Sequence, residues 1–498
     1  MLRTITPADM RRVEESAFAR GVPSILLMEQ AAGHVVDQLC DMLGDYRGKR
    51  VLFVAGKGNN GGDAIAAARM FMRRGGEATV WLPQGCKTPD AEKNLIWLKS
   101  MEKACLWECT VPPVIMRSAG FAAVVDGLFG TGFTGKPDKS AMFVIGCINE
   151  LQLPVLSIDV PSGMNALTGE IFDDICVHAA RTVTFHRPKL GLYLTRRRAY
   201  VRDLVVAPLD LPYEIEDVER DIASNYLSAE PHDLPALLPP RTRDMHKGAC
   251  GRLVIYAGSM GMSGAAAMAG LASLRAGAGL TTVICPREIM PILQTQLPNA
   301  MCMDCSQLPQ RVPLHDAFVF GCGIMEDDDD WQHILSLHDE SIPAVWDAGA
   351  LNLLSRNPMN IGKNTVLTPH AAEAARLLST ELSVILADPI AAAQAIREKY
   401  NCGVVVLKGA TTVITDGKRV ALNVVGTSAL AKGGSGDALA GILGALLAGG
   451  QPLFEAAQGA CLWHGMAGLY AKQKLGVRSV LTGDVADALG ACLKEVTE

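Results

Sequence analysis

The sequence lacks a large charge excess and a long apolar run, and each absence excludes a class of partner. Lys and Arg number 46 and Asp and Glu 52, so the formal net charge of −6 gives no overall attraction to a phosphate backbone or an anionic membrane. The longest apolar stretch, residues 438–450, falls short of the roughly 20 residues that span a bilayer and predicts a buried helix. We therefore expect neither nucleic acid nor a membrane as a partner.

The sequence also lacks an export signal and a dense set of cysteines. Residues 1–16 contain no apolar run followed by a small-residue cleavage site. The 14 cysteines are scattered, which is typical of a reducing compartment, and the one C-x-x-C motif, Cys302 to Cys305, has no second pair or histidine at zinc spacing. The sequence therefore predicts a cytoplasmic protein with free thiols.

Alternating strands and helices are what the sequence does contain. Between residues 51 and 210, short β-branched runs alternate with helical patterns, as in a doubly wound parallel sheet, and residues 7–43 have the apolar spacing of two leading helices. The alternation stops in an acidic, proline-bounded stretch and resumes from residue 253, where Asp416-Gly417 also marks a hairpin. We predict an α/β protein of two domains, at 1–215 and 236–498, joined by a linker at 216–235.

Three glycine-rich turns follow strands of the first domain. The turn at 56–63 opens a helix, so its backbone N–H groups predict an anion site. An NAD dehydrogenase would also need an acidic residue at the end of the next strand, and this strand has none. Turns at 124–135 and 157–169 belong to the same sheet edge, which gathers a set of oxygen donors suited to a hard cation or a sugar hydroxyl. The set is Asn60, Asp63, Asp126, Asp159 and Ser162, and the alternative for each Asp is a loop cap.

These turns, together with residues 23–35, resemble the NAD(P)H-hydrate epimerase domain. The resemblance implies a Rossmann-like fold, a site for hydrated NADH and NADPH (NADHX and NADPHX), and a K⁺ ion. Lys57 and Ala64 depart from the family, which often has Pro and Gly there. The hydrate-binding residues that it implies are Asn59, Asn60, Gly61, Gly62, Asp63, Gly130, Thr131, Gly132, Phe133, Thr134, Gly135, Lys136 and Asp159, and the potassium ligands are Asn60, Asp126 and Ser162.

Epimerisation of the hydrate requires few chemical steps. The hydrate carries a hydroxyl on C6 beside ring nitrogen N1, so its stereocentre can be exchanged by reversible loss of a ring bond with proton shuttling. We hypothesise that Asp159 is the acid/base group, because the family places this strand-end carboxylate by the nicotinamide.

The second domain has a glycine nest at 433–436, before a long apolar helix with Asp437 in its first turn. Such a nest favours a transferring phosphoryl group, and an adjacent Asp can take the proton of an attacking hydroxyl. A simple helix cap is the alternative for Asp437. The turn at 408–412 suits phosphate and adenosine contacts. His370 lies at a helix start, where a histidine is more often a capping or packing residue than a catalyst.

These segments, with residues 246–280, 321–325 and 345–354, resemble the ADP-dependent NAD(P)H-hydrate dehydratase domain. The resemblance implies a ribokinase-like fold that uses ADP with Mg²⁺. Ala372, Lys432 and the turn at 321–325 depart from the family pattern. It implies hydrate binding by Ala265, Gly323, His370 and Asp437, and nucleotide binding by Lys408, Gly409, Ala410, Thr411, Thr412 and Gly436.

The two resemblances together imply a bifunctional repair enzyme with NADHX, NADPHX and ADP as its small-molecule partners. The first domain would interconvert the S and R forms at C6, and the second would dehydrate the S form with ADP, releasing AMP and phosphate, with Asp437 as the catalytic base. Similar proteins are often homo-oligomers. Two alternatives stay open: a ribokinase-type small-molecule kinase with a regulatory first domain, and a first domain that is a non-catalytic scaffold.

Overall fold

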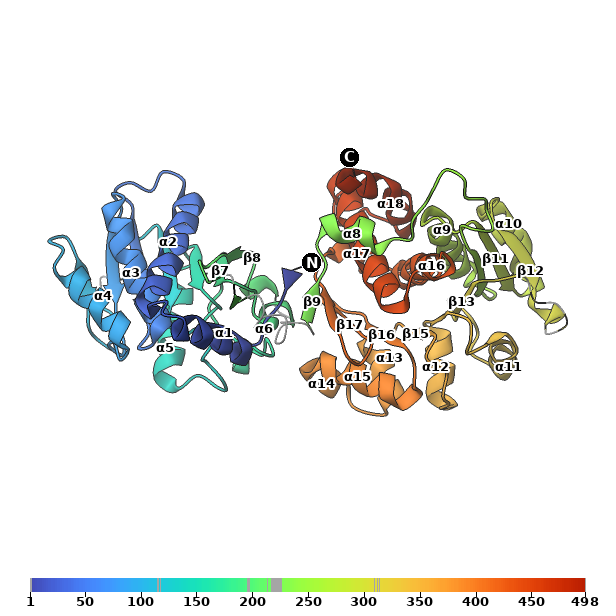
Figure 1. Ribbon diagram of the computed structural model, residues 1–498, viewed down its shortest axis with the longest axis horizontal. Coiled ribbons are helices and arrows are strands. Elements are labelled where there is room, and N and C mark those ends of the chain that lie inside the picture. The colour runs from blue at the N-terminus through green and yellow to red at the C-terminus, as the bar shows by residue number, and fades with distance from the viewer. Residues whose placement is uncertain are drawn as a thin grey trace. The chain divides into compact units, whose positions relative to one another are not determined.

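The computed structural model describes residues 2–497 except 114, 115, 117, 195–197, 213, 216–225, 309, 311 and 313. The chain divides into two compact units, Arg3–Ser224 and Asn225–Glu498 with Met1–Leu2 (Figure 1). Residues 216–225 of the expected linker lie outside the described residues, and Tyr226–Ser228 of its remainder form strand β9. The domain limits of 1–215 and 236–498 stay predictions.

The first unit contains a parallel sheet in the order β4-β3-β2-β5-β6-β7-β8, counted over the described residues. The alternation of strands and helices expected between residues 51 and 210 is confirmed, and the edge strands β4 and β8 are partly exposed. The strands are β2 (Arg50–Ala55), β3 (Glu77–Trp81), β4 (Cys105–Trp107), β5 (Ala123–Gly127), β6 (Val155–Ile158), β7 (Arg181–Phe185) and β8 (Asp203–Ala207).

Helices cover both faces of this sheet. Val51 and Phe53 of β2 belong to the core formed with α2 and α3, while Leu52 and Val54 belong to the opposite core formed with α5. Burial on both faces explains why these strands read as continuous apolar runs. The helices are α1 (Pro7–Ala19), α2 (Ser24–Leu43), α3 (Asn59–Arg73), α4 (Pro89–Lys99), α5 (Lys139–Glu150) and α6 (Leu190–Leu194), so the two leading helices are confirmed.

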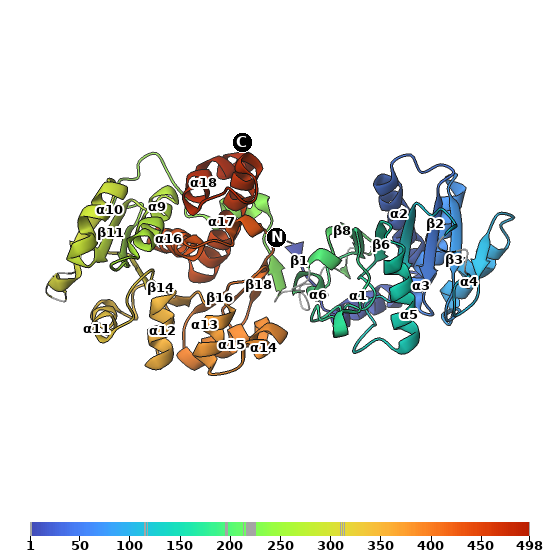
Figure 2. The ribbon, with the colours of Figure 1, turned by 180° about the vertical axis from the view of Figure 1, so that it is seen from behind.

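The second unit is built on a mixed sheet in the order β1-β9-β18-β17-β16-β15-β14-β13-β10-β11-β12, again among the described residues (Figure 2). From β12 to β16 neighbouring strands are parallel, and β16, β17 and β18 pair antiparallel, which confirms the hairpin. The strands are β1 (Leu2–Arg3), β9, β10 (Arg252–Tyr256), β11 (Leu280–Cys285), β12 (Met301–Asp304), β13 (Ala317–Phe320), β14 (Ala344–Trp346), β15 (Thr365–Leu367), β16 (Val404–Leu407), β17 (Thr412–Thr415) and β18 (Val420–Asn423).

The helices of this unit lie in two layers, with α8, α9 and α16–α18 on one face of the sheet and α11–α15 on the other (Figure 1). The apolar stretch at 438–450 forms most of α16, whose residues from Ala438 to Ala448 are buried, so this expectation is confirmed. No described helix is long and apolar enough to cross a membrane. The helices are α8 (Leu234–Leu237), α9 (Ser263–Arg275), α10 (Met290–Gln296), α11 (Asp328–Leu337), α12 (Gly349–Arg356), α13 (Ala371–Leu378), α14 (Leu382–Ala387), α15 (Pro389–Tyr400), α16 (Ser435–Ala448), α17 (Leu453–Leu475) and α18 (Thr482–Thr497).

Candidate functional sites

A cavity of about 640 Å³ opens at the carboxyl ends of the first unit's strands. Its volume suits a small-molecule ligand. Helix α1 contributes Arg11 and Glu14, and the turn before α3 contributes Lys57. Of the residues implied by the resemblance, those lining the cavity are Asn59, Asn60, Asp63, Gly130, Thr131, Gly132, Phe133, Thr134 and Asp159.

Asp159 follows β6 with a left-handed backbone, at φ 68°, and its carboxylate is held by several donors. Thr131 N donates to Oδ2 at 2.9 Å, and Thr184 Oγ1 donates to Oδ1 at 3.2 Å. Lys189 Nζ lies 2.8 Å from Oδ1 and is itself buried. A non-glycine residue in this backbone conformation is uncommon, and such conformations cluster at functional sites.

Two further carboxyl groups share this cavity. Burial, followed by the charges of Asp159 and Glu14, raises the pKa of Asp63 well above its ordinary value. Burial likewise raises the pKa of Glu14, against the opposing charge of Lys189. With Asp90, the cavity therefore combines four carboxyl groups with Lys189, and strongly shifted groups in a cleft are typical of a functional site.

Four residues implied by the resemblance take other positions. Gly61 and Gly62 pack inward: a Cβ at Gly61 would lie 1.8 Å from the carbonyl oxygen of Gly56. Gly135 and Lys136 do not line the cavity, and the exposed Lys136 pairs with Asp173. Gly61 thus allows a close approach of α3 to its preceding turn, and Gly62 a close approach to Met28 and Ala91, while their contact with the hydrate stays a prediction.

The residues implied for potassium lie together beside the cavity, which Asn60 itself lines. Both oxygens of the fully buried Asp126 accept hydrogen bonds from Ser162: Oδ1 from the hydroxyl at 2.6 Å and Oδ2 from the backbone N–H at 2.9 Å. Asn60 Nδ2 donates to the carbonyl of Phe129 at 2.8 Å, and this carbonyl also accepts from the Ser162 hydroxyl. Burial raises the pKa of Asp126, and none of the ion pairs among the described residues involves it.

In the second unit, the glycine nest brings Asp437 beside a buried ion pair. Lys408 Nζ lies 2.6 Å from Asp347 Oδ1, which also accepts from Thr368 Oγ1 at 2.8 Å. A Cβ at Gly436 would be 3.4 Å from Lys408 Nζ. Burial and the charge of Asp347 raise the pKa of Asp437 to about 6. Lys408 therefore lies under the nest, at the place where phosphoryl charge would accumulate.

Cys322, in the turn after β13, completes this group. Its Sγ and the carboxylate oxygens of Asp347 and Asp437 all lie within 4.8 Å of one another. The thiol hydrogen-bonds to Asp437, and burial raises the pKa of Cys322 well above its ordinary value. A neutral thiol is a poor ligand for a hard cation, so only the carboxylates suit Mg²⁺.

The remaining residues implied for the dehydratase surround this group. A Cβ at Gly323 would lie 2.7 Å from Cβ of Ala265, so these two positions are in contact. His370 caps α13, accepting at Nδ1 from the backbone N–H groups of Ala372 and Glu373 at 3.1 and 3.3 Å. Gly409 and Ala410 are exposed in the turn between β16 and β17, at whose end Thr411 and Thr412 lie.

The departure at Lys432 has a structural role. Its ammonium group donates to the carbonyls of Arg478, at 2.7 Å, and Val480, and so fastens the segment before α18 to the glycine nest.

Sequence reasoning missed Lys189 and Asp347. Asp347 directly follows strand β14, as Asp159 directly follows β6, and this shared position was the available signal. Lys189 lies four residues beyond the end of β7, and the sequence alone gave no indication that it turns back to Asp159.

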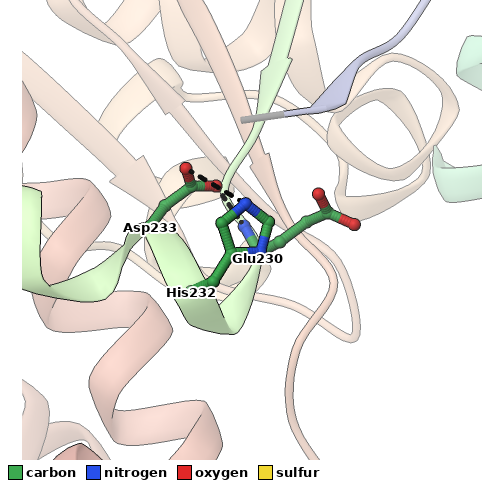
Figure 3. A group of neighbouring side chains, drawn as sticks. All are labelled: Glu230, His232 and Asp233. Atoms are coloured by element: carbon green, nitrogen blue, oxygen red, sulfur yellow. Dashed lines mark hydrogen bonds and ion pairs between the residues drawn. The ribbon is translucent and has the colours of Figure 1, made fainter. Parts of the chain in front are cut away.

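One further group of side chains in the second unit includes none of the residues described above (Figure 3). Glu230, His232 and Asp233 have potential ligand atoms within 4.8 Å of one another. Glu230 and Asp233 form a capping box, in which Glu230 N donates to Asp233 Oδ2 at 2.9 Å. The exposed His232 lies beside them, so the group is accounted for as the start of a short helical segment.

Two family models match the chain. One, described as "YjeF-related protein N-terminus", matches residues 24–191, and one described as "NAD(P)H-hydrate dehydratase" matches residues 253–490. Among solved structures, a Bacillus subtilis protein described as an ADP/ATP-dependent NAD(P)H-hydrate dehydratase, co-crystallised with ATP and Mg²⁺, is 28% identical with a TM-score of 0.50. That match covers 54% of this chain and 97% of the other.

Fold and sites together define a two-domain α/β enzyme that acts on small molecules. Proteins named as bifunctional NAD(P)H-hydrate repair enzymes match nearly the whole length: one from Moorella thermoacetica is 34% identical over 99% of this chain and 97% of its own. One from Escherichia coli is 34% identical over 98% of this chain and 94% of its own. The chain belongs to the family of bifunctional NAD(P)H-hydrate repair enzymes.

Proposed function

We propose that this chain repairs hydrated NADH and NADPH, with an epimerase site in the first unit and a nucleotide-dependent dehydratase site in the second. Membership in the repair family supports both activities. The observation that carries the assignment of sites is that each unit holds a carboxylate beside glycine-rich turns at the carboxyl edge of its sheet: Asp159 in one and Asp437 in the other.

In the first unit, Asp159 acts as the acid/base group. Its carboxylate takes the proton of the C6 hydroxyl as the C6–N1 bond breaks, the electron pair of that bond stays on N1, and the same carboxyl group delivers the proton to N1. Reclosure on the other face of the aldehyde reverses these transfers and gives the other epimer. The location of Asp159 in the 640 Å³ cavity, with donors that fix its carboxylate, supports this role.

Potassium would be held by Asn60, Asp126 and Ser162. Their oxygen atoms fit a hard cation, and the fully buried Asp126 carboxylate needs a positive charge that no described ion pair supplies. When bound, K⁺ would supply that charge and fix the turn that carries Phe129. Asp126 and Ser162 already hold this turn through hydrogen bonds to the backbone N–H groups of Leu128 and Phe129.

In the second unit, Asp437 deprotonates the C6 hydroxyl, which attacks the β-phosphorus of ADP and displaces AMP. The phosphate then leaves C6 with the electron pair of its C–O bond, pushed by N1, and loss of a ring proton restores the reduced cofactor. The pKa of Asp437, raised by burial to about 6, lies close to the pH at which a general base works well. Lys408 and the backbone of Gly436 stabilise the phosphoryl charge.

Mg²⁺ with the nucleotide would be held by the carboxylates of Asp347 and Asp437 together with phosphate oxygens. Asp347 Oδ1 is engaged by Lys408 and Thr368, which leaves Oδ2 as the oxygen for such a contact. The cation supplies charge neutralisation when bound. Assembly into a homo-oligomer and a reducing, cytoplasmic location belong to the same proposal, the last supported by 14 free cysteines.

Two conservative variants test the assignment of sites. Asp159→Asn in the full chain should abolish interconversion of the C6 epimers, measured by chiral chromatography, and leave ADP-dependent recovery of NADH absorbance from the S form intact. Asp437→Asn should abolish ADP-dependent recovery of NADH absorbance and leave interconversion of the C6 epimers intact. Retained epimerisation by a folded Asp159→Asn protein would remove Asp159 from its role, and near-normal dehydration by Asp437→Asn would do the same for Asp437.

A further inference from the structure

Lys189 is a buried lysine whose ammonium group lies inside the epimerase cavity. The residue is 2% exposed, lies just before α6 and lines the cavity together with Asp159. Its Nζ donates to the carbonyl of Phe185 at 2.9 Å and lies 2.8 Å from Asp159 Oδ1. Lys136, the lysine implied by the resemblance, does not line the cavity, so it does not replace Lys189 at this carboxylate.

The backbone around Lys189 is fixed by the chain's first strand segment. Ile5 N donates to the carbonyl of Pro188 at 3.0 Å, and Leu190 N donates to the carbonyl of Ile5 at 3.1 Å. Ile5 is buried, so this clamp lies in the core of the unit. The position of the ammonium group is therefore determined by the fold and not by a flexible surface side chain.

Lys189 divides the two oxygens of Asp159 into different roles. Oδ1 is engaged by Lys189 and by Thr184 Oγ1, whereas Oδ2 accepts from Thr131 N as its one partner among the described residues. A carboxylate oxygen can accept two hydrogen bonds. Oδ2 therefore keeps an acceptor position for the hydrate, and the Oδ1 contacts prevent the carboxylate from rotating away.

Lys189 also opposes the negative charge of the cavity. Glu14 and Asp63 line the same space as Asp159, and Lys189 acts against the upward shift of both their pKa values. Arg11 has the same effect on Glu14. Among these described groups, Lys189 is thus the cation that forms a direct ion pair with the reacting carboxylate, that of Asp159.

We propose that Lys189 is a positioning residue of the epimerase site, which fixes Asp159 through Oδ1 so that Oδ2 exchanges the proton with the hydrate. This inference rests on the proposed role of Asp159. Lys189 contacts no reacting atom. Its removal should therefore lower kcat, which depends on the orientation of Asp159, and leave KM nearly unchanged.

The test is Lys189→Met in the full chain, with both epimerase and dehydratase activities measured. We expect epimerase kcat to fall by about 100-fold with KM within about threefold of the wild type. Lys189→Arg, which keeps the charge and a donor, should restore kcat to within about tenfold. Lys49→Met is the matched control, because Lys49 donates to a backbone carbonyl, that of Leu43, and does not line the cavity.

A double-mutant cycle separates this inference from the proposed role of Asp159. If Asp159→Asn is already inactive, adding Lys189→Met should change residual activity by less than about twofold. A Lys189→Met protein with wild-type kcat, or with a raised KM as its one change, would overturn the inference while leaving Asp159 in place. An active Asp159→Asn protein would instead refute the proposed function.

Should Lys189→Met fail to fold, Thr184→Val provides a second readout. It removes the other donor to Oδ1 and nearly preserves side-chain volume. We expect kcat to fall by about three- to tenfold with KM unchanged. Unchanged kcat in a folded Thr184→Val protein, together with an inactive but folded Lys189→Arg protein, would also overturn the inference.

Discussion

Asp437 has opposite consequences for catalysis and for folding. Its carboxyl group keeps its proton up to a pKa of about 6 in the folded chain, against 3.8 for an ordinary Asp, because it is buried near the charge of Asp347. The protonated Asp437 therefore makes its full contribution to the free energy of unfolding below about pH 4. This contribution is lost as the pH rises through 6. Above that pH the ionised group costs about 2 kcal/mol, allowing for its partial exposure.

Asp437→Asn should consequently stabilise the second unit while it abolishes dehydration. We expect the free energy of unfolding to rise by about 2 kcal/mol at pH 8 and by clearly less at pH 5, measured by urea denaturation. Asp329→Asn, at an exposed position in the first turn of α11, is the control and should change stability by less than about 0.5 kcal/mol. A less stable Asp437→Asn protein at pH 8 would contradict the prediction.

Single residues also show where sequence reasoning ends. Asn60, Asp126 and Ser162 could be grouped in advance because they belong to the three glycine-rich turns of one sheet edge, and the structure brings them together. Lys189 could not, because its contact with Asp159 depends on how the segment beyond β7 is clamped by Ile5. Local pattern predicts what lies at a strand end, but not which later loop turns back to it.

At the scale of elements, the start of α3 depends on a close backbone approach. A Cβ on Gly61 would lie 1.8 Å from the carbonyl oxygen of Gly56, which no real Cβ can do. Gly61→Ala should therefore lower the free energy of unfolding by more than about 2 kcal/mol and impair epimerisation, although alanine normally favours a helix.

The matched control is Gly146→Ala in α5, where an added Cβ meets nothing within 4 Å. This change should stabilise the unit by up to about 1 kcal/mol. Urea denaturation of both variants gives the comparison. Equal stability of the two variants would show that the turn before α3 relaxes easily.

The elements that escaped prediction have a common physical cause. Strands β4, β8, β9 and β12 are partly exposed and lie at or next to a sheet edge, so they lack the burial on both faces that marks the central strands. Central strands such as β2 and β5 are buried throughout or nearly so, and their apolar runs are what the sequence analysis detected. Sequence thus predicts the buried middle of a parallel sheet better than its edges.

At the scale of the whole molecule, the chain contains two compact units, each with its own core. We expect calorimetry to resolve two unfolding transitions, since independent cores need not unfold together. ADP with Mg²⁺ should raise the temperature of one transition and leave the other unchanged, because a ligand stabilises the unit that binds it. A single transition, or two that shift together, would contradict this expectation.

The two units share one feature, an ion pair between a carboxylate and a lysine at the proposed reaction site. The pairs are Asp159 with Lys189 and Asp347 with Lys408. Because both pairs are shielded from solvent, dissolved ions can weaken them little. Changes in ionic strength should therefore act on how the charged dinucleotide reaches each site, while the groups that perform the chemistry keep their alignment.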